Sequence, residues 1–447
     1  MQELYAFIDK KRETILQELI EFCALPSVAA KGEKEIMDKT AKWVATALEK
    51  SGLTIEIHET KGVSVVTGHL DAGADKTLLY YNHYDCQPAE PLELWDSPPF
   101  EPTVRNERLY ARGVADNKGN LLSRIWAVRA FAEVGIDVPV NIKFIAEGEE
   151  EVSSPNLPEF VSKNRDFLKA DGGIWEFGYA GPDGTQEAWL GLKGILYVQL
   201  ESERLKRDVH SANACFLPSA TWDLLWAINS LKDENERVLI EGFYDDVRAL
   251  SANEMEMLES TDLLPDLMKE FYQIESFIKN LSGMALKEAY YNAPTCNICG
   301  IGAGWQGPGG KTVLPAEAMA KIDFRLVADQ TPEDILGKLR QHLDKKGFQN
   351  IKIAWHDGYR PSRTPVDHPF VEVVKRATKA VHGHEPRVHI TSPGSGPLYL
   401  FERLVPMVSV GCGDFDSRGH APNESVPLDL FFLDIKRQAA IIDEMGR

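Results

Sequence analysis

The sequence predicts an α/β protein of two domains, and three observations carry this prediction. Strand-like and helical segments alternate over residues 1–191, which favours a sheet with some parallel strands. The pattern changes near residue 192 to a smaller α+β unit, and α/β character resumes past residue 360. The 447 residues are also more than one ordinary core accommodates. We therefore predict a larger α/β domain with a mixed central sheet, formed by 1–191 and 361–447, and an inserted α+β domain formed by 192–360.

Periodicity defines the elements of the larger domain. Two amphipathic helical stretches open the chain, at about 2–24 and 33–51. Three strand-like runs follow, TIEIHE, VSVVTG and TLLYYN, and the last of them leads to His83. The helical stretch NLLSRIWAVRAFAEVG precedes two further strands, VNIKFIA and GGIWEF. After the insertion, VEVVKRATKAV predicts a helix and RLVPMVSVGCG a strand.

The insertion has a different pattern. LKGILYVQLESE predicts a strand and SATWDLLWAINSL a helix, and a polar helical stretch is expected to continue to about residue 290. Strands near 294–301 and 318–327 flank a glycine-rich loop, and a helix (PEDILGKLRQHLDKK) and a strand (NIKIAWH) complete the unit. Cys296 and Cys299 form a CxxC without a second pair, so we expect ordinary buried cysteines and not a zinc knuckle.

Composition excludes several classes of function. The chain has 49 basic and 68 acidic residues, a formal net charge of −19, and no basic cluster, which excludes nucleic acid as a partner. Charges interrupt the apolar N-terminal positions, so we expect no signal peptide. No apolar run approaches the ~18 residues of a membrane span. Six scattered cysteines fit a reducing compartment, and we predict a cytoplasmic location.

Metal-ligating side chains follow apolar segments in several places. YYNHYDC supplies His83 and Asp85, which point the same way from an extended segment, so Asp85 can accept the second ring proton of a metal-bound histidine. Three glutamates, 149–151, end the apolar run NIKFIA, a costly arrangement unless cations neutralise them. The other members of the set are Asp116 in ARGVADNKGN, Glu176 in GIWEFG and His420 in SRGHAPNES. Taken singly, these motifs could also be a loop histidine, a helix cap or an exposed turn.

Together the motifs indicate a metal centre. Two histidines with several carboxylates suit a pair of Zn²⁺ ions, or Mn²⁺ or Co²⁺, bridged by one carboxylate. Such a pair lowers the pKa of a shared water and holds a reacting carbonyl oxygen. A neighbouring carboxylate that binds no metal is then needed as the base.

These residues resemble the dinuclear-zinc exopeptidases and deacylases related to carnosinase, carboxypeptidase G, bacterial dipeptidases and acetylornithine deacetylase. The resemblance covers nearly the whole chain. Its most specific stretch is HYDCQP, WDSPPFEP and LYARGVADNKG, supported by EGEEE, DVHSA, KTVLPAEAMAKIDFRLV and GHAPNE. It implies that the larger domain is a catalytic, zinc-exopeptidase-like domain and that the insertion is a lid through which two chains dimerise.

The resemblance also implies the metal ligands. Asp116 would bridge the two ions, His83 and Glu176 would complete one site, and Glu151 and His420 would complete the other. In family members the peptide bond after the bridging aspartate is cis, so we expect a cis bond between Asp116 and the next residue.

Further roles follow from the same resemblance. Glu150 would be the general base and Asp85 would orient His83. In the lid, His210 would reach the active site of a dimer mate and polarise the carbonyl, and the guanidinium of Arg325 would grip the substrate carboxylate. The remaining substrate-contacting positions would be Thr312, His368 and Ser395, each of which has an alternative role in a loop or cap.

The predicted activity is metal-dependent hydrolysis of the amide bond of dipeptides or short peptides next to a free carboxylate, by attack of a water that bridges the metals. One alternative is a deacylase of N-acetyl or N-succinyl amino acids on the same metal site. Another is a non-catalytic module that binds metal or peptide. Two features depart from the family pattern: Glu176 stands where the dipeptidases usually carry Asp, and TSPGSGP replaces the usual serine loop.

Overall fold

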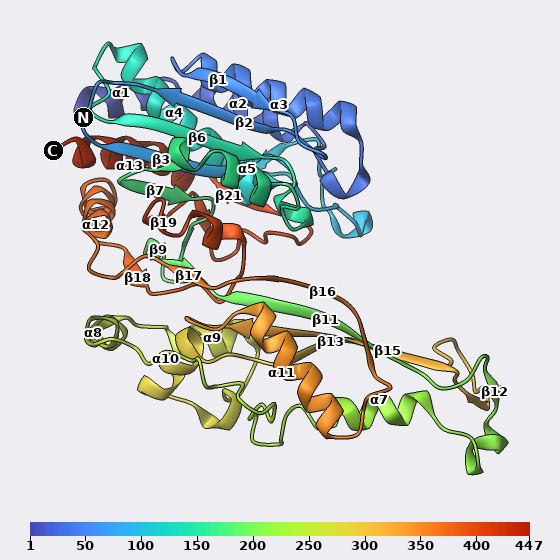
Figure 1. Cartoon of the computed structure of the whole chain (residues 1–447). Coiled ribbons are helices and arrows are strands. Elements are labelled where there is room, and N and C mark those ends of the chain that lie inside the picture. The colour runs from blue at the N-terminus through green and yellow to red at the C-terminus, as the bar shows by residue number, and fades with distance from the viewer.

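The computed structural model describes all residues from Met1 to Arg447 and contains two bodies, each built on its own sheet (Figure 1). The larger body has an eight-stranded sheet of order β1-β2-β6-β3-β7-β19-β9-β18. Its strands are β1 (Thr54–His58), β2 (Val65–Leu70), β3 (Thr77–His83), β6 (Asn141–Glu147), β7 (Gly172–Trp175), β9 (Glu187–Trp189), β18 (Arg387–His389) and β19 (Met407–Ser409). Parallel and antiparallel pairs occur together, as the predicted mixed sheet requires.

Helices cover both faces of this sheet because its central strands are buried on both sides. Along β3, Leu78 and Tyr80 join the core on one face, whereas Leu79 and Tyr81 join the core on the other. The first face is covered by α1 (Gln2–Lys10), α2 (Arg12–Cys23), α3 (Lys34–Glu49), α4 (Gly119–Val134), α12 (Pro369–His382) and α13 (Leu428–Gly446). The second face is covered by α5 (Leu157–Lys163), α6 (Arg165–Leu168) and the 397–405 segment.

The smaller body is a four-stranded antiparallel sheet of order β13-β15-β11-β16 with helices on one face. Its elements are α7 (Ala220–Asn229), α11 (Pro332–Lys345), β11 (Gly194–Glu203), β13 (Asn297–Ala303), β15 (Glu317–Leu326) and β16 (Lys352–Tyr359). Burial alternates along β11, so one face packs on α7 and α11 and the other does not. The chain passes between the two bodies at β10 (Gly191–Leu192) and β17 (Ser362–Arg363), which pair with each other.

Two expectations for the insertion are wrong. The polar stretch up to 290 is broken into α8 (Ala252–Ser260), α9 (Pro265–Tyr272) and α10 (Gly283–Asn292). Leu264 has a φ of 52° immediately before Pro265, and Gln273 ends α9 with a φ of 53°, so no helix continues through either point. Cys299 is exposed, unlike buried Cys296, because it lies on the edge strand β13; both thiols are free.

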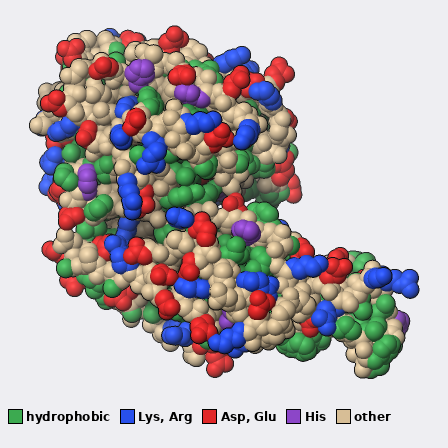
Figure 2. All heavy atoms as spheres, in the orientation of Figure 1, with side chains coloured by type: hydrophobic (Ala, Val, Ile, Leu, Met, Phe, Trp, Pro, Cys, Tyr) green, Lys and Arg blue, Asp and Glu red, His purple; other side chains and the backbone are tan.

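The charged side chains of the surface are not segregated by sign. Figure 2 shows acidic and basic side chains intermixed over the visible face of both bodies. No helix combines the length and the apolar character that crossing a bilayer requires.

Candidate metal centre

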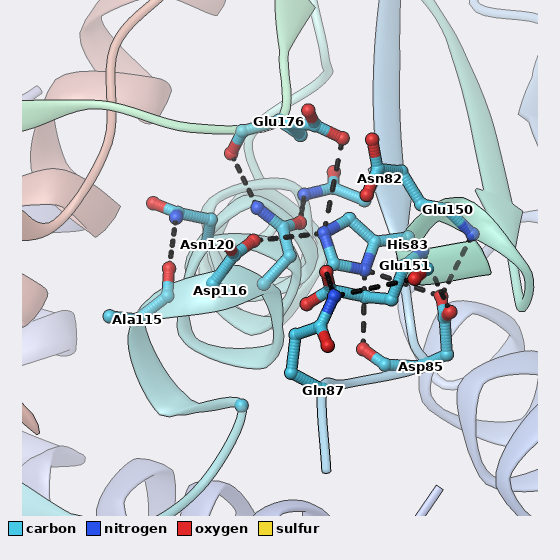
Figure 3. A network of polar contacts seen from close by, with 12 residues as sticks. Asn82, His83, Asp85, Gln87, Ala115, Asp116, Asn120, Glu150, Glu151 and Glu176 are labelled. Atoms are coloured by element: carbon cyan, nitrogen blue, oxygen red, sulfur yellow. Dashed lines mark hydrogen bonds and ion pairs between the residues drawn. The ribbon is translucent and has the colours of Figure 1, made fainter. Parts of the chain in front are cut away.

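The carboxyl ends of three neighbouring strands bring the predicted ligands together. β3 pairs in parallel with both β6 and β7, so their carboxyl ends meet at one edge of the sheet. His83 ends β3, the turn that holds Glu150 and Glu151 follows β6, and Glu176 follows β7 directly. Figure 3 shows these side chains turned toward one another around Asp116.

Asp116 lies between two histidines that come from opposite ends of the chain. Its Oδ1 is 3.0 Å from Nε2 of His83, and its Oδ2 is 2.9 Å from Nε2 of His420. Nε2 of His420 is also 3.1 Å from Oε2 of Glu151, and Nε2 of His83 is 3.9 Å from Oε2 of Glu176. The cluster therefore has two halves, one on each oxygen of Asp116.

The backbone around Asp116 is not that of a helix cap. Its φ and ψ are −130° and 85°, and Lys118 is the N-cap of α4. The Asp116–Asn117 bond is cis, as expected. The Asn117 side chain accepts a hydrogen bond from Nδ2 of Asn82 and donates one, 2.8 Å long, to the carbonyl of Glu176. Sequence reasoning did not identify these two asparagines, because neither belongs to a metal-binding pattern.

A buried glutamate that the sequence did not point to holds the loop of Asp116. Glu424 accepts hydrogen bonds from the backbone N–H groups of Gly113, Ala115 and Asp116 at 2.8–3.1 Å. It also pairs with Nη1 of Arg112 at 2.7 Å, and both side chains are only 1% exposed. Its one signal in the sequence is its place four residues after His420 in the GHAPNE stretch. The three-stranded sheet of β4 (Thr103–Arg105), β5 (Arg108–Tyr110) and β21 (Ser425–Pro427) joins the two loops.

Asp85 connects His83 to the glutamate turn. Nδ1 of His83 lies 3.3 Å from Oδ1 of Asp85 and 3.2 Å from its backbone oxygen. The same carboxylate accepts the backbone N–H groups of Glu150 and Glu151, at 3.3 and 3.0 Å. On the other side of the turn, Gln87 donates to Oε2 of Glu151 at 2.9 Å. The orientation of the ring and the position of both glutamates are thus fixed by one buried aspartate.

The electrostatics of the cluster favour bound cations. Burial, with the negative charge of Glu176 second, raises the pKa of Glu150 well above its ordinary value, and burial raises that of Glu176 to about 8. Burial also opposes ionisation of Asp116, but hydrogen bonds to His420 and His83 hold the pKa of this carboxyl below its usual range. Oε1 of Glu151 and Oε2 of Glu176 are buried with no hydrogen-bond partner. Such oxygens are costly unless a cation satisfies them.

The donor set fits divalent metals. His83, Asp116 and Glu151 each offer a ligand atom, and these atoms lie within 4.8 Å of one another. Imidazole nitrogens and carboxylate oxygens suit Zn²⁺, Mn²⁺ and Co²⁺. The residues present therefore match the metals that the sequence led us to expect.

Two of the predicted substrate contacts lie beside this cluster. Nη1 of Arg325 donates to Oγ of Ser395 at 2.8 Å. A Cβ built on the next residue, Gly396, would come within 3.7 Å of Glu150 and 3.9 Å of Glu176. The loop of Ser395 is thus packed against the carboxylates, and the arginine reaches the same place from the smaller body.

The other predicted contacts lie elsewhere in the chain. His210 and Thr312 are neighbours, with Nε2 of the first 3.5 Å from Oγ1 of the second. His210 ends β12 (Val209–His210) and Thr312 directly precedes β14 (Val313–Leu314), and these two strands pair at the far tip of the smaller body in Figure 1. His368 caps α12, where its Nδ1 accepts the N–H of Phe370 at 3.2 Å. Its assignment to substrate binding stays a prediction.

Comparison with known proteins identifies the class to which this fold and site belong. The model of peptidase family M20/M25/M40 matches residues 79–444, so the chain belongs to that family. It is therefore a hydrolase of the metallopeptidase class, and the non-catalytic binding module is not supported. The family implies divalent metal ions as cofactors.

Individual relatives match over their full length. The Cys-Gly metallodipeptidase dug1 of Schizosaccharomyces pombe is 29% identical over 476 residues, covering 100% of this chain and 98% of that protein. The M20 metallo-carboxypeptidase Sso-CP2 from Sulfolobus solfataricus has a TM-score of 0.91 and 37% identity, covering 97% of this chain and 99% of its own. Human carnosine dipeptidase 1 has a TM-score of 0.84 and 25% identity, covering 100% and 98%. The predicted fold class and family are thus confirmed.

Replacing Glu424 tests its role in holding the loop. We expect Glu424→Gln to lower the free energy of unfolding by about 3–5 kcal/mol, because it leaves a buried arginine unpaired and turns an amide donor toward backbone donors. Urea unfolding in the presence of a chelator measures this without a contribution from metals. Glu107→Gln, at an exposed turn, is the control and should change little. Equal stability of the two variants would contradict the role of Glu424.

Proposed function

We propose that the chain is a dinuclear metallopeptidase of the dipeptidase or carboxypeptidase type, which hydrolyses the amide bond of dipeptides or short peptides next to a free carboxylate. The observation that carries this proposal is the position of Asp116, whose two oxygens face two different histidines. The printed names of the relatives, a metallodipeptidase, a metallo-carboxypeptidase and a carnosine dipeptidase, support peptides as substrates. They do not favour the alternative, an N-acyl amino-acid deacylase.

We assign two metal ions to the cluster, zinc first and manganese or cobalt as alternatives. Asp116 would be shared by the two ions, His83 and Glu176 would complete the ligands of one, and Glu151 with His420 would complete those of the other. The distances of 3.0 and 2.9 Å on the two sides of Asp116 support this division. The unpartnered oxygens of Glu151 and Glu176 support it independently, one in each half.

Each side chain of the cluster is assigned one role in the hydrolysis. Bound metals would supply Lewis-acid activation of a water and of the scissile carbonyl. Glu150 removes a proton from the attacking water and returns it to the leaving amine. Its raised pKa suits this exchange, because burial and neighbouring carboxylates make the neutral acid accessible. Asp85 keeps His83 in position.

The substrate carboxylate is assigned to Arg325 and Ser395. The guanidinium already contacts Ser395 at 2.8 Å, and the loop of this serine lies against Glu150 through Gly396. A planar guanidinium presents two parallel N–H groups to a carboxylate. When the C-terminal carboxylate of a peptide is held there, the amide bond that precedes its C-terminal residue lies beside the general base, Glu150.

We further propose that residues 192–360 are a lid domain through which the protein forms a homodimer, with residues 1–191 and 361–447 as the catalytic domain. His210 and Thr312 lie at the far tip of the lid, so in this arrangement they serve the active site of the partner chain. Large apolar side chains are exposed nearby, as a stable interface requires: Phe216 is 71%, Trp222 56% and Trp226 55% exposed. Figure 2 shows hydrophobic side chains gathered at this tip. The cysteine usage of the sequence supports a cytoplasmic location.

The general base can be distinguished from the ligands by an isosteric substitution. We expect Glu150→Gln to keep its metals and to lower kcat by about 10²–10⁴-fold, the usual effect of losing such a base. Metal analysis and dipeptide hydrolysis on the same preparation measure both effects. Glu149→Gln is the matched control, because Glu149 instead accepts a hydrogen bond from Asn156. Loss of a metal ion from Glu150→Gln would make Glu150 a ligand instead.

Mixing two inactive variants tests whether His210 acts in the partner chain. His210→Ala and Glu150→Gln should each be inactive, and co-refolding them should restore about one quarter of wild-type turnover. Random pairing makes half of the dimers mixed, and one of the two sites in each is then complete. Size-exclusion chromatography checks the dimer. If the mixture shows no more activity than the separate variants, or a fully active monomer is found, His210 does not act in trans.

A further inference from the structure

A cavity opens directly beside the metal cluster. Its volume is about 570 Å³, and its wall includes Asp116 and His420. Cavities that enclose small ligands measure roughly 300–1,000 Å³. The space is therefore larger than the scissile bond alone needs, and the proposed mechanism leaves it unassigned.

One wall of the cavity is an apolar face of α9. Met268 and Tyr272 are four residues apart on α9, so they share one side of the helix, and both line the cavity together with Leu264, which directly precedes the helix. Tyr179 and Phe415 line it from the larger body. Both of these lie close to the metal ligands: half-buried Tyr179 lines the cavity together with Asp116, and Phe415 precedes His420 by five residues.

Contacts to the larger body hold α9 in place. The ring of Phe271 packs edge-on against Phe415, with centroids 4.4 Å apart. Just before the helix, Oγ1 of Thr261 donates to the carbonyl of Val388 at 3.0 Å. The flanking helices α8 and α10 pack against strands β9 and β18 through a cluster of four buried side chains, which are Trp189, Leu258, Tyr291 and Ile390. The segment from α8 to α10 lies within the insertion in sequence, yet it builds a wall of the site on the larger body.

The charged groups of the wall are mostly paired within the protein. Arg387 pairs with Asp183 at 2.5 Å, Arg108 with Asp414 at 2.6 Å, and Arg418 with Asp416 at 2.9 Å. Such groups offer little to a charged side chain of a substrate. The aromatic and aliphatic side chains instead favour burial of apolar surface.

The direction in which a bound peptide runs follows from what lies on each side of the metal cluster. The Arg325–Ser395 pair lies on the side of Glu150 and Glu176, whereas the cavity lies on the side of Asp116 and His420. Pro393, from the loop of Ser395, also lines the cavity, so the two places adjoin. A peptide with its carboxylate on the arginine extends across the metals into the cavity.

We propose that this cavity is the subsite for the residue on the acyl side of the scissile bond, and that α9 makes it select large apolar side chains. The proposal rests on the proposed function, because that function fixes where the carboxylate lies. Met268 is the central residue of the selecting face. A larger side chain there fills the subsite from within the helix.

Dipeptides with a common C-terminal residue test the selection. With Gly, Ala, Leu, Phe, Asp or Lys at the first position, the metal-loaded wild type should show kcat/KM at least about 10-fold higher for Leu and Phe than for Gly and Ala, the effect that a few methylenes have in an apolar pocket. Met268→Trp should lose that advantage by about 10-fold or more, because the larger side chain fills the subsite. Leu267→Trp is the matched control on the same helix, because Leu267 does not line the cavity, and it should keep the wild-type preference.

The two proposals fail in different ways. If the metal-loaded wild type cleaves none of these dipeptides, the proposed function is wrong. If it cleaves them with equal kcat/KM, or prefers Asp or Lys, the function stands and the apolar subsite is wrong. The subsite is also wrong if Met268→Trp and Leu267→Trp have the same preference.

Discussion

The site depends on the placement of one carboxylate, Asp116, between His83 and His420. These histidines belong to segments near the start and the end of the chain, and only the folded larger body brings them to within 3.0 and 2.9 Å of the aspartate. The loop that carries Asp116 has little regular structure of its own. Glu424 accepts hydrogen bonds from three backbone N–H groups of this loop and pairs with Arg112, so a buried ion pair supplies the backbone hydrogen bonds that a helix or strand would otherwise provide.

The same small volume concentrates negative charge, which bound cations would offset. Glu150, Glu151 and Glu176 end buried strands where like charges repel and water is excluded. Asp85 accepts backbone N–H groups of the glutamate turn and Gln87 donates to Glu151, which orders the ligands but leaves two carboxylate oxygens without partners. Buried carboxylates without partners lower the stability of the fold locally, and such arrangements are typical of functional sites.

Sequence predicted the larger body well, because its strands are long apolar runs and its ligands stand at strand ends. His83, Glu150, Glu151 and Glu176 could be found by that rule alone, whereas the bridging role of Asp116 and the trans role of His210 came only from the resemblance. Glu424, Asn82 and Asn117 were not found, because none belongs to a metal-binding pattern and their hydrogen bonds join segments that lie far apart in the sequence. The packing of the segment from α8 to α10 against β9 and β18 was also missed, since contacts so distant in sequence leave no local pattern.

Counting the metals in the wild type and in Asp116→Asn tests the dinuclear centre most directly. After reconstitution with Zn²⁺ and removal of excess metal, elemental analysis should find two ions per wild-type chain and fewer than one in the variant. The amide of asparagine cannot bridge two cations as a carboxylate does, and both halves of the cluster share this residue. One ion per wild-type chain, or two in Asp116→Asn, would contradict a centre bridged by Asp116.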